Sequence, residues 1–186
     1  MLSINEIKSG SQIIVNNDPY TILNVQHSKM GRAGAVLRTK MKNLKTGNIL
    51  NKTFQGAEKV EKADIEEKKG QYLYGDGSNF FFMDNDNYEQ FEIPTEVIGE
   101  QSKFLKEETE IGIIYFKETP INIKLPIKMN FKVTEAPPAI KGNTADGGSK
   151  QVTLENGITV NTPLFIKEGD EIRVNTETGE YAERVK

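Results

Sequence analysis

Apolar and polar residues alternate along much of the chain in short runs, and turn-forming residues separate these runs. A period of two is typical of strands that bury one face. The clearest pair of runs, residues 20–26 and 36–42, flanks a basic loop that contains two glycines and Arg32. Because glycine allows tight reversals, the pair predicts a hairpin with Arg32 near its tip. Residues 22–28, at about 3.3 Å each, would carry that tip about 20 Å along a hairpin arm.

The same strand-and-turn spacing continues to the end of the chain and predicts an all-β fold of three consecutive small β-barrels. The expected domains are 1–63, 64–126 and 127–186, and the charged residues 58–69 are expected to contain the first linker. Residues 97–106 form a modest helix candidate, weakened by Gly99. The further expected strands are residues 12–15, 49–54, 71–74, 79–84, 110–116, 121–124, 129–135, 151–154, 159–160, 164–166, 171–174 and 181–185.

Aromatic residues are concentrated at residues 71–74 and 79–84. They suit either the packed interior of a barrel or an exposed platform on which nucleic-acid bases stack. Because the surrounding segment is acidic, we expect them to fill a barrel interior.

The net charge of −3 hides an uneven distribution. Residues 1–63 contain ten Lys and Arg against four Asp and Glu, whereas residues 64–126 contain six against fourteen. The basic first third predicts a polyanionic partner, and the acidic middle third would repel phosphate or face a basic protein.

Basic side chains follow the expected hairpin. Arg38, Lys40 and Lys42 share one face of the strand after the tip. On its own, this row is explained as well by a solvated strand face as by a binding site. Together with Lys29, Arg32, Lys45 and Lys52, it predicts a strip that contacts phosphates.

The composition argues against an enzyme. Cysteine is absent and His27 is the single histidine, which excludes Cys–His nucleophiles and leaves little for a zinc site. The carboxylates are scattered rather than paired, and a permanently protonated arginine such as Arg32 cannot act as a general base. The glycine-rich residues 141–150 lack the spacing of a nucleotide-binding loop. No run approaches the roughly 18 apolar residues of a membrane span, so we expect a cytoplasmic binding protein without cofactor or metal.

Several motifs together resemble one family over the whole length of the chain. The C-terminal third carries KQVTLENG, PLFIKEGD and NTETGEY, the middle third carries QYLY and FMD, and the first third carries Gly31-Arg32, RTK and NLKTG. In these motifs the chain resembles bacterial elongation factor P. The resemblance implies a KOW/SH3-like barrel followed by two OB-fold barrels, in an L-shaped arrangement that imitates transfer RNA.

The resemblance also implies a function. Such a factor binds the 70S ribosome beside peptidyl-tRNA and stimulates peptide-bond formation where consecutive prolines stall it. Arg32 would lie at the tip, supported by Lys29, Gly31 and Gly34. The side chains that would contact tRNA and ribosomal RNA phosphates are those of Arg38, Lys40, Lys42 and Lys45. We expect a monomer.

The chain departs from the family pattern at the tip. Many members carry a modifiable lysine within a Lys-Pro-Gly-Lys-Gly tip, whereas this chain has Met30, Arg32 and Ala33 at the corresponding positions. The arginine branch of the family carries rhamnose on this residue. Rhamnosylation of Arg32 by an arginine-modifying enzyme and an unmodified Arg32 therefore both stay open.

A second departure lies in the C-terminal third. The loop expected to approach the exit site reads Gly142-Asn143-Thr144 where many members have Gly-Asp-Thr. A contact made by the backbone would survive this change, but one made by the carboxylate would not. Two other functions stay open: a general OB-type RNA-binding protein, and the elongation factor P-like paralogue of the family.

Overall fold

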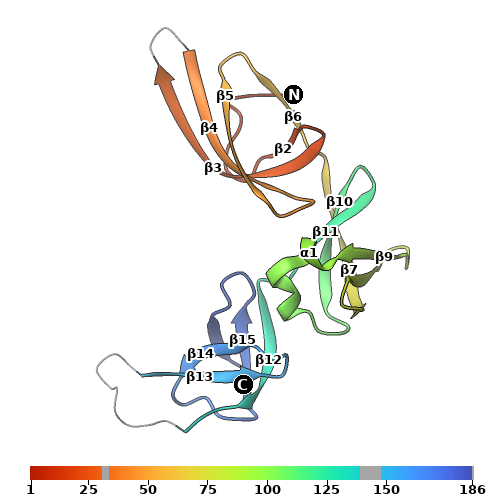
Figure 1. Cartoon of the computed structure of the whole chain (residues 1–186), viewed down its shortest axis with the longest axis vertical. Coiled ribbons are helices and arrows are strands. Elements are labelled where there is room, and N and C mark those ends of the chain that lie inside the picture. Colours follow the sequence, from red (N-terminus) through yellow and green to blue (C-terminus); the bar gives the residue numbers. More distant parts are fainter. Residues whose placement is uncertain (31–33, 139–147, 186) are drawn as a thin grey trace. The chain divides into compact units, whose positions relative to one another are not determined.

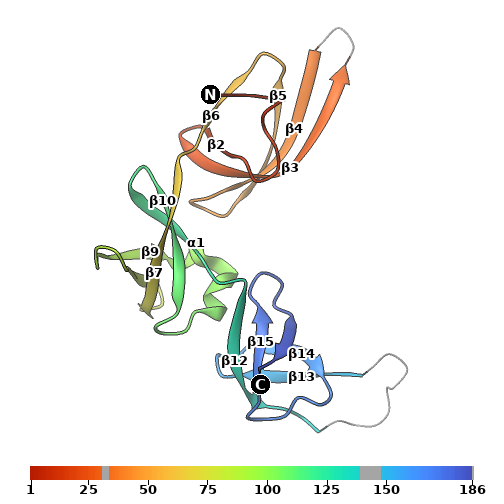
Figure 2. The ribbon, with the colours of Figure 1, turned by 180° about the vertical axis from the view of Figure 1, so that it is seen from behind.

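The computed structural model describes residues 1–30, 34–138 and 148–185 and confirms the predicted all-β fold (Figure 1 and, from behind, Figure 2). In the described residues the strands form three sheets. The chain divides into two compact units, Met1–Gly99 with Gly112–Lys124, and Glu100–Ile111 with Leu125–Lys186. Over the described residues, no helix is long and apolar enough to cross a membrane. The predicted boundaries at residues 63 and 126 stay predictions.

The first sheet has six strands in the order β1-β6-β2-β3-β4-β5. Asn16 and Asn17, both at positive φ, form the two-residue turn that joins β2 to β3. The inward faces enclose a core of large aliphatic and aromatic side chains, among them Ile13, Ile22 and Leu37. The strands are β1 (Leu2–Ser3), β2 (Gln12–Val15), β3 (Asp18–Met30), β4 (Gly34–Asn43), β5 (Ile49–Gln55) and β6 (Lys59–Lys62).

The second sheet has five strands in the order β11-β10-β7-β8-β9. Gly70 lies where β7 passes close to its neighbours: a Cβ there would stand 2.4 Å from Cδ1 of Ile113 and 2.7 Å from the backbone oxygen of Met83. The sheet's strands are β7 (Ile65–Gly75), β8 (Asn79–Asp84), β9 (Gln90–Pro94), β10 (Glu110–Phe116) and β11 (Thr119–Lys124). Strands β6 and β7 occupy most of the predicted linker at 58–69 and leave residues 63 and 64 between them.

The predicted helix at residues 97–106 begins earlier than expected and is less regular. It begins as α1 (Thr95–Ile98) and continues as the 3₁₀-helix η2 (Gly99–Phe104). Gly99, at φ 58°, ends the α-helical geometry because this conformation is left-handed. Phe104, at the end of η2, packs against Phe131 of the third sheet with ring centroids 6.1 Å apart.

The third sheet has five strands in the order β14-β13-β12-β15-β16. The predicted strand at 164–166 is wrong: β14 ends at Pro163 and a turn follows, in which Ile166 is buried and Phe165 is exposed. The apolar run therefore contributes to the core from a turn. The alternation of apolar and polar residues cannot distinguish such a turn from a short strand. The strands are β12 (Lys128–Glu135), β13 (Ser149–Leu154), β14 (Thr159–Pro163), β15 (Glu171–Asn175) and β16 (Tyr181–Arg184).

Candidate functional site

The predicted hairpin exists, and both of its strands are longer than the sequence pattern indicated. β3 and β4 pair continuously from Tyr20–Asn43 to Met30–Gly34, with a register shift beside Leu23 (Figure 1). β5 runs along the other edge of β4 as far as the pair Val36–Gln55. The arm is therefore three-stranded over most of its length, which makes it stiffer than a free two-stranded hairpin.

The tip itself, residues 31–33, lies outside the described residues, and so do the predicted positions of Gly31 and Arg32. For the supporting residues Lys29 and Gly34, the structure describes the backbone, which pairs in the last rungs of the hairpin. The described strands thus lead directly to the predicted tip.

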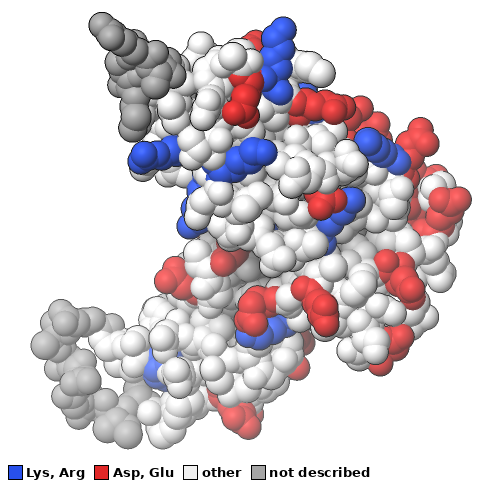
Figure 3. Space-filling view, turned by 45° about the horizontal axis from the view of Figure 1, so that its top comes forward, with Lys and Arg blue, Asp and Glu red and all other residues white. Residues whose placement is uncertain are grey.

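The basic row on β4 lies on the outer face of the arm. Arg38 and Lys40 are exposed and Lys42 is half-buried, while the intervening Thr39 and Met41 are buried. The alternation predicted from the sequence is confirmed here. In Figure 3, Lys and Arg side chains stand out on the N-terminal part of the molecule.

The strands on either side of this row contribute no carboxylate to it. Each cation of β4 is flanked by one residue of β3 and one of β5, and all of these neighbours are uncharged. Among the described residues, none of the three cations forms an ion pair. A row of unpaired cations between neutral side chains attracts phosphate without competition from internal anions. The flanking residues are Gln26 and Thr53 for Arg38, Asn24 and Asn51 for Lys40, and Thr21 and Ile49 for Lys42.

Lys45 has a different setting from the row. Its Nζ lies 2.8 Å from Oδ1 of Asp18 and 5.8 Å from the centre of the Phe116 ring. The hydrogen bond from Lys45 holds the pKa of Asp18 below its usual value. Nearby, the side-chain amide of Asn122 donates to the backbone oxygen of Leu44 at 2.9 Å. Lys45 is therefore paired with Asp18 within the first compact unit. Sequence spacing could not indicate this pairing.

On the described part of the arm, candidate catalytic groups do not gather. His27 is exposed on β3 opposite Leu37. Across the part of the chain that the structure describes, no group of three or more His, Cys, Asp or Glu residues could hold a metal ion.

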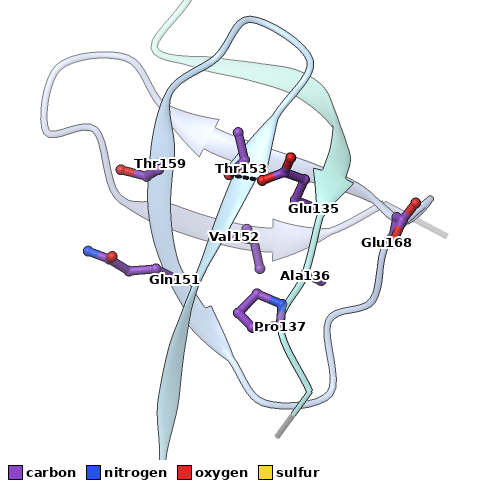
Figure 4. A pocket seen from close by; sticks show the side chains of 8 residues that line it. All are labelled: Glu135, Ala136, Pro137, Gln151, Val152, Thr153, Thr159 and Glu168. Atoms are coloured by element: carbon purple, nitrogen blue, oxygen red, sulfur yellow. Dashed lines mark hydrogen bonds between the residues drawn. The ribbon is translucent and has the colours of Figure 1, made fainter.

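The predicted exit-site loop, with Gly142, Asn143 and Thr144, lies outside the described residues. The strands that lead to it, β12 and β13, line a shallow pocket of about 480 Å³ (Figure 4). The hydroxyl of Thr153 donates to Oε2 of Glu135 at 3.3 Å, and Lys150 Nζ donates to the backbone oxygen of Pro137 at 2.9 Å. These contacts join residues 135–137, which precede the predicted loop, to β13, which follows it.

The middle sheet contains a buried polar pair that sequence analysis missed. The hydroxyl of Tyr115 donates to Oδ2 of the fully buried Asp84 at 2.7 Å. Burial alone would raise the pKa of Asp84, but the Tyr115 hydroxyl, the Asp86 backbone N–H and the charge of Lys68 outweigh it and lower that pKa. Burial, and then the bond to Asp84, raise the pKa of Tyr115. The pair stabilises the fold and lies apart from the basic row.

Comparison with known proteins identifies the family of this chain. Family models for elongation factor P match three consecutive stretches: the KOW-like domain at residues 3–60, the OB domain at 65–123 and the C-terminal domain at 129–184. The chain belongs to the elongation factor P family. Family membership establishes a translation elongation factor rather than an enzyme.

Curated relatives agree over the full length. The chain is 44% identical to elongation factor P of Thermodesulfovibrio yellowstonii over 186 residues, covering 100% of both chains. It is 45% identical to elongation factor P of Desulfitobacterium hafniense over 184 residues, covering 99% of this chain and 100% of that one. Among solved structures, a translation initiation factor 5A from Methanococcus jannaschii matches with a TM-score of 0.52 and 26% identity, covering 62% of this chain and 85% of that one.

Proposed function

We propose that this elongation factor binds the 70S ribosome beside peptidyl-tRNA and stimulates peptide-bond formation where consecutive prolines stall it. Full-length membership of the elongation factor P family is the observation that carries the proposal. The row of Arg38, Lys40 and Lys42, which has no carboxylate beside it, supports the proposal. Cations that are not already paired bind RNA phosphates more strongly than paired ones do.

In this mechanism the three-stranded arm acts as a rigid carrier. Its outer row contacts tRNA or ribosomal RNA phosphates, which fix position without reading sequence. Proline's ring fixes one backbone dihedral and makes the stalled acceptor hard to orient. A tip held close to the aminoacyl end would restrict the reactants to a productive geometry and remove part of the entropic barrier.

Arg32 is the proposed tip group. Its guanidinium stays protonated at every relevant pH and presents several donors in a fixed plane, which suits phosphate or ribose oxygens. Either of two covalent states would fit this role. One is the free side chain, and the other is an Arg32 that carries rhamnose added by an arginine-modifying enzyme. The intact mass of the protein from its native host distinguishes them, since one rhamnose adds one deoxyhexose residue to the unmodified mass.

The loop with Gly142, Asn143 and Thr144 is proposed to approach the exit site through its backbone. This proposal predicts that Asn143→Asp and Asn143→Ala leave the ribosome affinity unchanged. A gain in affinity for Asn143→Asp alone would instead point to a contact that a carboxylate makes better.

Two measurements test the proposal. The first follows synthesis of a Pro-Pro-Pro reporter on purified ribosomes with and without the chain, and the proposal expects a shorter pause in its presence. The second compares affinity for programmed ribosomes with affinity for free single-stranded RNA. A general RNA-binding protein would bind the free RNA tightly and leave the pause unchanged, which would overturn the proposal.

A further inference from the structure

One aromatic pair of the middle sheet lies outside its core, and a β-bulge puts it there. Tyr72 and Tyr74 are two residues apart, so a regular strand would place both on one face. A register shift between them inserts Leu73, so that Tyr72 opposes Phe82 and Tyr74 opposes Phe81. Because Phe81 and Phe82 point to opposite faces, Tyr74 is turned outward to join Phe81. The expectation that the aromatics fill a barrel interior is therefore correct for Tyr72 and Phe82 and wrong for Tyr74 and Phe81.

The two outward rings form a stacked pair on the outer face of the sheet. Tyr74 and Phe81 stack with centroids 4.6 Å apart and planes 16° from parallel. The Tyr74 side chain remains 49% exposed, while Tyr72 and Phe82 on the other face are buried. A stacked aromatic pair held open to solvent by a bulge offers its π-face to a ligand.

The charged residue that lies directly across the sheet from this aromatic pair is acidic. Glu92 of β9 lies directly beside Phe81, and Gln90, Met83 and Gln71 form the next rung on the same face. Over residues 70–102 the sequence has seven Asp and Glu and no Lys or Arg. The next cation along this face of β7 is Lys69, beyond the glutamine rung.

We propose that this acidic aromatic face, formed by Tyr74, Phe81 and Glu92, is a docking surface for a basic segment of a partner protein. An arginine of the partner stacks on the outer face of this aromatic pair through a cation–π contact and pairs with the Glu92 carboxylate. A nucleic acid could also stack on the rings, but its phosphates would meet the Glu92 carboxylate beside Phe81, whereas Lys69 lies farther along β7, beyond the glutamine rung. The proposal goes beyond the function proposed above and does not depend on how the Arg32 tip acts.

The test measures binding of a fluorescein-labelled peptide of alternating arginine and glycine to the full chain by fluorescence anisotropy. Tyr74→Ala and Phe81→Ala are each expected to weaken binding about two- to fivefold, and the double variant about tenfold. Tyr74→Phe retains the ring and is expected to bind within about twofold of the unaltered chain. Glu92→Gln is expected to weaken binding and to reduce its dependence on salt.

Tyr88→Ala is the matched control, because Tyr88 is 72% exposed in the acidic turn between β8 and β9 but has no stacked partner among the described residues. It is expected to bind as the unaltered chain does. Circular dichroism confirms that each variant is folded. Equal binding by all variants would overturn the proposal, as would a loss in Tyr88→Ala as large as that in Tyr74→Ala. Binding of a labelled uridine oligonucleotide that Tyr74→Ala abolishes would also overturn it and assign the face to RNA.

Discussion

The ammonium group of Lys45 lies 2.8 Å from Oδ1 of Asp18, so this cation is already paired within its own unit. Arg38 and Lys40, on the same hairpin, have no such partner in the described part of the chain. The four cations assigned to phosphate binding on sequence grounds therefore fall into two kinds. Those of β4 are available to an external anion, and Lys45 would first have to leave Asp18.

This difference predicts a small, structural effect of Lys45→Ala. The pair is more than one third exposed, so its loss should lower the free energy of unfolding by about 0.2–1 kcal/mol. Ribosome affinity should change by less than about twofold, because the Lys45 ammonium group is already paired with Asp18 and is not free to bind a phosphate. Urea denaturation and ribosome pelleting measure the two quantities. A large loss of affinity with unchanged stability would show that Lys45 releases Asp18 and contacts phosphate itself.

Arg38→Ala and Lys40→Ala should act in the opposite way. Each removes one unpaired exposed cation and should leave stability almost unchanged. Each should reduce the slope of log affinity against log salt by about 0.7–0.9, the contribution of one phosphate contact. Binding of the labelled factor to ribosomes at several potassium concentrations measures the slope.

Lys59→Ala is the matched control for these two variants. Lys59 is an exposed lysine of β6 in the same sheet, paired in register with Ser3 and away from the β4 row. Its removal should leave the salt slope unchanged. If all three variants shift the slope equally, the attraction comes from the net charge of the domain and not from the row.

Tyr115→Phe should destabilise the middle sheet by about 1–3 kcal/mol at neutral pH, because it leaves Oδ2 of the buried Asp84 without its donor. Asp84 has a lowered pKa in the folded state, so its ionised form stabilises the fold above the usual carboxyl pKa near 4, and this stabilisation is lost as pH falls. The cost of Tyr115→Phe should accordingly shrink at acidic pH.

Hydrogen exchange of β8 and β10 amides, measured at pH values from neutral to acidic, reports this local stability. Tyr88→Phe serves as the control, since the Tyr88 side chain is largely exposed. A cost of Tyr115→Phe that stays constant with pH would contradict the assigned role of the Asp84 charge.

Much of the fold could be predicted because period-two alternation reports directly on strands with one buried face. The β3–β4 hairpin and the strand of residues 110–116 were predicted in this way. The turn containing Ile166 was not, because a buried apolar run looks the same in a turn as in a strand.

The site was predictable only where a side chain's direction follows from counting along the strand. The row of Arg38, Lys40 and Lys42 meets that condition and was predicted. The outward turn of Tyr74 depends on a bulge, and the engagement of Lys45 depends on Asp18, a residue far away in sequence. Counting within one strand reveals neither of them.

The central claim, that a permanent positive charge at the tip acts at the stalled peptidyl-tRNA, is tested most directly by the Pro-Pro-Pro reporter with Arg32→Ala. The variant should bind ribosomes nearly as well as the unaltered chain, because the β4 row is intact, yet leave the pause as long as it is without any factor. Lys59→Ala should shorten the pause fully. Relief of the pause by Arg32→Ala at the unaltered rate would contradict the account.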